Sequence, residues 1–382
     1  MRLIHFFGAA LLLSSYAYAA STFNHSPNTI SSSVVVKTGA FNNFTESQLP
    51  QAPNGLSCTV TQNVVLTSQS EVDDFPTKYT PDCTYVEIQG DLLITGSDIS
   101  DLSNLEGIVA IVGNLYLSKN PKLLNLQRLY RLATVTKSIE IAHNPALESL
   151  EGLNALNDVT GALVILDNPN LQDLEGLMGL QYVGADLVIS DDNNLTSLSG
   201  LNLLKSVGGE FGINNNQSLT SLSGTPKLTQ IGNLHIQSNT KLTDLSGLPT
   251  FDEITGYIEI GGNDHLQSLN GLNLNSHTVG SLAIVDNPTL TDMNALQMLQ
   301  DVKQSINISG NGELTTLLGL HNITPLDPST DKPTKSLTLE NETKLTDCIG
   351  ICPFLSWVGP NQLQTENLTS ECMRIVGNKA CP

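Results

Sequence analysis

Residues 161–184 read GALVILDNPNLQDLEGLMGLQYVG, and residues 185–208 read ADLVISDDNNLTSLSGLNLLKSVG. Both segments contain an apolar-x-apolar step, an Asn or Asp five residues after its first member, and then Leu at every third position. The step has the period of a strand with one inward face, and the Leu spacing suits an extended or 3₁₀-like return path. A period of roughly 24 residues is typical of leucine-rich repeats, so the sequence predicts a mainly β solenoid.

The same pattern extends over residues 91–345 and predicts a right-handed array of parallel strands with about eleven coils. An insertion at residues 321–335, which contains three prolines, interrupts the period and predicts a protruding loop. The first aliphatic residue of each expected strand is Leu92, Leu115, Ile139, Leu163, Leu187, Phe211, Leu234, Ile258, Leu282, Ile306 or Leu337.

An asparagine column lies five residues after these strand positions. Because an amide side chain both donates and accepts, stacked Asn residues can satisfy backbone groups that a tight turn leaves unpaired. We therefore expect the column to be scaffold and not a ligand site. Its members are Asn120, Asn144, Asn168, Asn216, Asn239, Asn263, Asn287 and Asn311.

The six cysteines lie only at the two ends of the repeat, which predicts disulfides in an N-terminal cap, residues 58–90, and a C-terminal cap, residues 346–382. The spacing leaves the pairing of the last four cysteines open. A zinc site lacks a second pair of ligands at suitable spacing, so we expect no metal and no cofactor. The cysteines are Cys58, Cys83, Cys348, Cys352, Cys372 and Cys381.

The first 19 residues have the arrangement of a secretory signal peptide: Arg2, an apolar run too short to span a bilayer, and small residues ending at Ala19. Residues 20–57 are rich in Ser, Thr, Asn and Pro and predict a flexible segment. No later stretch approaches a membrane span, and no C-terminal GPI signal follows. We expect a secreted protein, either extracellular or associated with a cell wall, without a membrane span of its own.

The formal net charge of -20 argues against nucleic acid as a partner, because an acidic surface repels the phosphate backbone. The expected partner is therefore an extracellular protein or a cell-wall polysaccharide. The sequence does not indicate the oligomeric state.

The repeat G-x-L-x-I-x2-N-x2-L-x2-L-x-G-L-x2-L-x2-V, as it stands at residues 161–183, resembles the receptor L-domain-like branch of leucine-rich repeat proteins. The resemblance covers roughly residues 58–381, and residues 67–83 and 345–381 look like the caps of such arrays. That family includes growth-factor receptor ectodomains, fungal cell-wall proteins and bacterial surface proteins. The resemblance therefore implies ligand binding, adhesion or wall organisation.

Enzymatic chemistry has one candidate, the acids Asp186 and Glu210, which precede their strands on adjacent coils. A glycosidase needs two carboxyl groups about 5–10 Å apart, and stacked coils can supply that spacing. A repeating lattice with 37 acidic residues produces such a pair by chance, so we expect no enzyme. The sequence also contains no H-E-x-x-H or G-x-S-x-G motif.

Outward strand positions in the third to fifth coils are apolar and flanked by acids, which suggests either a contact patch or a surface covered by an N-terminal segment or a loop. Tyr116, His235 and Tyr257 add amphipathic side chains, and we expect His235 to be solvated at the surface. The candidate patch comprises Ala142, Ala162, Val164, Leu166, Val188, Glu140, Asp186, Glu210, Tyr116, His235 and Tyr257.

Eight N-x-S/T sequons are present, of which Asn216 belongs to the column expected to be buried. The remaining candidates for glycosylation are Asn24, Asn43, Asn194, Asn307, Asn322, Asn341 and Asn367. The leading hypothesis is a secreted, non-enzymatic binding or adhesion protein. The alternatives are a structural wall or matrix protein and, more remotely, a polysaccharide-active enzyme.

Overall fold

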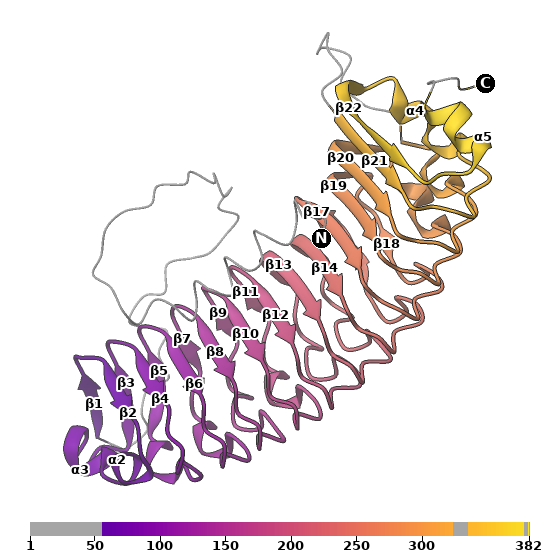
Figure 1. Cartoon of the computed structure of the whole chain (residues 1–382). Coiled ribbons are helices and arrows are strands. Elements are labelled where there is room, and N and C mark those ends of the chain that lie inside the picture. Colours follow the sequence, from indigo (N-terminus) through magenta and orange to yellow (C-terminus); the bar gives the residue numbers. More distant parts are fainter. Residues whose placement is uncertain (1–55, 324–334, 378–380, 382) are drawn as a thin grey trace. The chain divides into compact units, whose positions relative to one another are not determined.

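A computed structural model describes residues 56–323, 335–377 and 381, all within one compact unit, Pro50–Pro382. The chain winds in successive coils, and most coils place strands in two columns that pair in parallel with the neighbouring coils (Figure 1). The protein is therefore a parallel β solenoid, as the repeat predicts. The expected signal peptide, residues 20–55 of the expected flexible segment and residues 324–334 of the expected loop lie outside the described residues.

The second strand column contains the strands that the sequence pattern predicts. It has thirteen strands in the described part, two more than the eleven anchors, because β2 and β22 add coils inside the segments expected to be caps. In order they are β2 Val64–Leu66, β4 Leu92–Ile94, β6 Leu115–Ser118, β8 Ile139–Ala142, β10 Leu163–Leu166, β12 Leu187–Ser190, β13 Ser206–Asn214, β14 Gln230–Gln237, β17 Tyr257–Gly261, β19 Thr278–Val285, β20 Asp301–Ser309, β21 Lys335–Glu340 and β22 Val358–Glu366.

The first strand column comes just before the second in each coil, and sequence reasoning missed it. Its strands are often only two residues long, too short for a period to be recognised. In the longer β13, β14, β19 and β20, one continuous strand serves both columns. The separate strands are β1 Ser57–Val60, β3 Tyr85–Ile88, β5 Ile108–Ile111, β7 Thr134–Val135, β9 Asp158–Val159, β11 Tyr182–Val183 and β16 Glu253–Ile254.

The interior is filled by aliphatic side chains from both columns and from the return path. Leu163 and Ile165 of β10 are fully buried, whereas Val164 between them points outward and is half-buried. The return path carries short 3₁₀ turns at several coils, which agrees with the Leu spacing. These are η2 Ser103–Leu105, η3 Gln127–Leu129, η4 Glu175–Leu177, η5 Asn294–Met298, η6 Leu318–Leu320 and η7 Ile349–Ile351.

The asparagine column is a buried hydrogen-bond ladder, as expected. The backbone N–H of Asn144 donates to Oδ1 of Asn168 at 3.2 Å, and Nδ2 of Asn144 donates to the carbonyl of Leu117 at 2.9 Å. All eight asparagines have no exposed surface, so each amide satisfies backbone groups that water cannot reach. The column is therefore scaffold, and the sequon at Asn216 is enclosed in it.

Two carboxylic acids, Asp192 and Glu342, continue this ladder and are also fully buried. Oδ1 of Asp192 accepts from the backbone N–H and Nδ2 of Asn168, in the manner of its asparagine neighbours. Its Oδ2 has no hydrogen-bond partner, and neither has Oε2 of Glu342. Burial raises the pKa of each carboxyl to about 7, because the charged form is poorly solvated there.

Short helices and three disulfides close the two ends of the solenoid. The helices α2 Gln69–Asp73 and α3 Phe75–Tyr79 bury Val72 and Phe75 over the first coils, and Cys58 is bonded to Cys83. At the other end lie α4 Cys352–Leu355, α5 Ser370–Cys372 and the π-helical turn η8 Met373–Gly377. There the structure resolves the open pairing as Cys348–Cys372 and Cys352–Cys381.

Candidate functional site

The outward side chains of the second strand column form one continuous row across the coils. Register places Tyr116 beside Glu140, Glu140 beside Val164, and Val164 beside Val188. Further along the row, Val188 lies beside Gly212, and Gly212 beside His235. We call the stretch from β6 to β17 the outer face. The eleven residues of the predicted patch thus lie along the coils from β6 to β17, with five strands between that of Tyr116 and that of Tyr257. The structure brings Glu210, His235 and Tyr257 into direct contact.

The exposure of these residues is uneven. Tyr116, Glu140, Ala162, Val164, Leu166, Asp186 and Tyr257 are half-buried, whereas Ala142, Val188, Glu210 and His235 are buried. The expectation that His235 is solvated is therefore wrong, since only 1% of its surface is exposed. Its neighbour in register, Gly212, has no side chain, and the carboxylate of Glu210 occupies the space above that glycine against the imidazole.

Glu210 is the centre of a hydrogen-bonded cluster on the outer face. Its Oε2 accepts from Oη of Tyr257 at 2.5 Å, and its Oε1 lies 3.4 Å from Nδ1 of His235. Burial by itself would raise the pKa of Glu210, but the hydrogen bonds from His235 and Tyr257 outweigh it and lower that pKa. The pKa of Tyr257 is raised by burial and by its bond to the carboxylate. The cluster therefore holds Glu210 in its charged form.

Gly212 and Asn214 are members of this cluster that sequence reasoning missed. A Cβ at Gly212 would lie 2.7 Å from Oε1 of Glu210 and 3.4 Å from Nδ2 of Asn214. Oδ1 of Asn214 and Nε2 of His235 are both buried and have no hydrogen-bond partner. The signal was present in the sequence: in the 24-residue alignment, Gly212 occupies a position where the preceding coils carry Glu140, Val164 and Val188.

Asp186 lies at the corner between the two columns, where its side chain accepts a hydrogen bond from the backbone of the next coil. Its Oδ1 accepts the backbone N–H of Glu210 at 2.7 Å. Asn114 and Asn233 do the same for Ser138 and Tyr257 on the next coils. Burial raises the pKa of Asp186, the bond from Glu210 opposes that rise, and the charge of Glu210 adds to it. The two acids singled out as a conceivable catalytic pair thus both have contacts within the scaffold.

The part of the face around Glu140 is acidic and apolar. Burial raises the pKa of Glu140, and electrostatic interactions with His143 and Lys119 oppose that rise. The pKa of Tyr116 is raised by burial and by the negative charges of Asp91 and Glu140. Val164 and Leu166 project from the next strand, so aliphatic surface lies beside acidic side chains.

Other predicted features can be placed on the described residues. Asn194, Asn322, Asn341 and Asn367 are exposed, Asn307 is half-buried, and Asn24 and Asn43 lie outside the described residues. The described residues contain no group of three or more His, Cys, Asp or Glu side chains arranged to hold a metal ion. A search of the same residues found no helix with the length and apolar character needed to cross a membrane.

The disulfides at both ends are typical of proteins that fold in an oxidising compartment. Comparisons of the chain with protein-family models, with curated proteins and with solved structures found no match.

Proposed function

We propose that this protein is a secreted, non-enzymatic binding protein that attaches to a cell surface through the outer face. The single observation that carries the proposal is the pairing of Val164 with Glu140 in register, with Leu166 two residues further along β10 and Asp186 directly before the neighbouring strand β12. All four side chains are half-buried, so they present a continuous surface without extending freely into solvent. Rigid, half-exposed side chains lose little conformational freedom when a partner covers them.

The charge on this face selects the chemistry of the partner. Glu140, Asp186, Glu210 and Glu259 lie on or beside the row, and the chain has a net charge of -20. A protein surface that carries Lys or Arg around an apolar centre would complement both the acids and the aliphatic side chains. We therefore propose a basic protein partner in preference to a polysaccharide.

Binding of the fluorescently labelled full chain to intact cells of its source, measured by flow cytometry, tests the proposal. Val164→Glu should reduce binding by at least about tenfold, since it places a charge at the centre of the contact. The matched control is Thr338→Glu on β21, which adds the same charge to the outward row beyond the face. Trypsin treatment of the cells should abolish binding, and raised salt should weaken it.

Two results would contradict the proposal. One is unchanged binding of a Val164→Glu variant whose circular dichroism and thermal unfolding match the unmodified protein. The other is binding that survives trypsin but disappears when cell-surface glycans are digested, which would assign the partner to polysaccharide.

A further inference from the structure

The return path departs from its usual form between residues 250 and 298. Two neighbouring coils have short strands there, β15 Thr250–Phe251 and β18 Asn273–Leu274, which pair with each other in a separate two-stranded sheet. The following coil returns to a 3₁₀ turn, η5, which at five residues is longer than the other 3₁₀ turns described. The backbone of β18 is extended, whereas that of η5 is helical, so the two neighbouring segments do not follow the same path. A recess therefore forms on the surface between β18 and η5.

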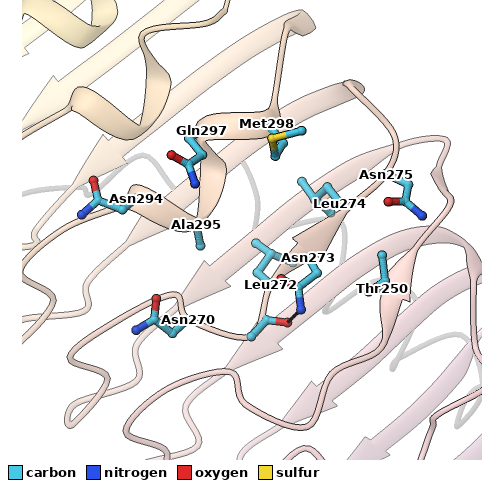
Figure 2. A pocket seen from close by; sticks show the side chains of 11 residues that line it. Thr250, Asn270, Leu272, Asn273, Leu274, Asn275, Asn294, Ala295, Gln297 and Met298 are labelled. Atoms are coloured by element: carbon cyan, nitrogen blue, oxygen red, sulfur yellow. Dashed lines mark hydrogen bonds between the residues drawn. The ribbon is translucent and has the colours of Figure 1, made fainter.

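This recess contains a pocket of about 480 Å³, which we call the amide pocket. Its volume is in the range of small-molecule sites. Figure 2 shows the side chains of Asn270, Asn294 and Gln297 on one side of the pocket and those of Thr250, Asn275 and Met298 on the other. The complete lining is Thr250, Asn270, Gly271, Leu272, Asn273, Leu274, Asn275, Asn294, Ala295, Gln297 and Met298.

The lining is entirely uncharged and has two kinds of surface. Leu272, Leu274 and Ala295 supply apolar atoms, and Met298 adds an aliphatic side chain that is 52% exposed. Around them are five amide side chains, those of Asn270, Asn273, Asn275, Asn294 and Gln297. An ionic ligand would find no counter-charge among these residues.

Three of the amides are free to bind a ligand. The side chains of Asn270, Asn294 and Gln297 are exposed and make no hydrogen bond to any other residue in the described ranges. Their neighbours differ in this respect, since Nδ2 of Asn275 donates to Asp252 at 2.8 Å and Nδ2 of Asn273 donates to the carbonyl of Gly271. An amide offers two donors and an acceptor, which suits adjacent hydroxyl groups that must each donate and accept.

We propose that the amide pocket binds a neutral oligosaccharide. The C–H face of a sugar ring would rest on Met298 and Ala295, and its hydroxyl groups would bond to Asn270, Asn294 and Gln297. A peptide that binds as an additional β-strand would fit less well. It would have to pair with the edge of β18, and η5 already packs along that edge. The pocket shares no residue with the outer face, so this site is independent of the proposed protein partner.

Isothermal titration of the full chain with neutral hexasaccharides of glucose, mannose and N-acetylglucosamine tests the proposal. Hexagalacturonic acid and a Gly-Ser hexapeptide serve as the charged and peptide probes. We expect at least one neutral hexasaccharide to bind with a dissociation constant in the millimolar range. Gln297→Ala should weaken that binding by about fivefold, the effect of losing one hydrogen bond to a neutral group.

The matched control is Asn202→Ala, because Asn202 is an exposed amide at the position equivalent to Gln297 in a coil that does not line the pocket. Met298→Ala should weaken binding as well, and Val164→Glu should leave it unchanged. The proposal is overturned if no neutral hexasaccharide binds, or if a charged or peptide probe binds more tightly. Equal binding by Gln297→Ala, Met298→Ala and the unmodified chain would also overturn it.

Discussion

The buried asparagine ladder and the outer face are built from the same coils at the same 24-residue spacing, yet they differ in how their polar groups are satisfied. In the ladder, each asparagine bonds to the coil on either side, and the residue type hardly varies. Along the outer face the residue type changes from coil to coil, and Nε2 of His235 and Oδ1 of Asn214 are unpaired. The unpaired atoms of the ladder, Oδ2 of Asp192 and Oε2 of Glu342, belong to its two acids and are buried. A uniform column whose asparagines are all bonded indicates scaffold, whereas a variable column on an outward face is where a partner can add contacts.

The largest expected effect comes from removing one amide of the ladder. Asn263→Ala would leave the backbone N–H of Asn239 and the carbonyl of Ile236 without their side-chain partners. The carbonyl of Gly261 and Oδ1 of Asn287 would each lose a bond as well, so the free energy of unfolding should fall by about 3 kcal/mol. Chemical denaturation provides the measurement, and Asn202→Ala, at an exposed amide, should change it by less than about 0.5 kcal/mol. Equal losses in the two variants would remove the distinction between ladder and surface.

The second effect concerns Asp192, one of the two acids that take the place of an asparagine in the ladder. The pKa of Asp192 is about 7 in the folded protein against an ordinary value of 3.8, so folding takes up a proton between those pH values. The carboxyl therefore favours folding most below pH 4, and this contribution is lost as the pH rises towards 7 and above. The nearby charges of Asp191 and Asp167 act in the same direction, by disfavouring the ionised form.

Asp192→Asn should consequently raise the free energy of unfolding by about 2 kcal/mol at pH 8 and change it little at pH 4. An amide restores a donor at the position of Oδ2, as in the neighbouring asparagines. Denaturation curves across pH 4–8 give the measurement, with Glu148→Gln as a control at an exposed acid. A gain of the same size at both pH values would show that Asp192 does not titrate in this range.

The third effect concerns the cluster on the outer face. Glu210→Gln removes the charge that accepts from Tyr257 and His235 and should lower the free energy of unfolding by about 1–2 kcal/mol at pH 7. Folding lowers the pKa of Glu210. The stability difference between Glu210→Gln and the unmodified protein should therefore shrink as the pH falls below the pKa of an ordinary Glu. Tyr257→Phe tests one bond alone and should cost less. If Glu210→Gln were as stable as the unmodified protein at pH 7, the cost of burying the carboxylate would cancel the stabilisation from its hydrogen bonds.

The repeat made the ladder and the alternation along β10 predictable, because both depend only on period: Asn168 must stack on Asn144, and Val164 must point away from Ile165. The Glu210 cluster was less accessible to sequence reasoning. Tyr257 reaches Glu210 across 47 residues, and the contact depends on the missing side chain at Gly212. The amide pocket arises from a local change of return path, which leaves no periodic signal.

The smallest expected effect lies at the centre of the outer face itself. Val164→Thr keeps the shape of a half-buried side chain and should change the free energy of unfolding by no more than about 0.5 kcal/mol. Ile165→Thr, one residue along the same strand, buries a hydroxyl in the core and should cost about 3 kcal/mol. Thermal and denaturant unfolding of the two variants measure how much stability depends on the outward and on the inward face of β10. If Val164→Thr were as damaging as Ile165→Thr, the outward valine would belong to the scaffold, and the proposed contact surface would lose its apolar centre.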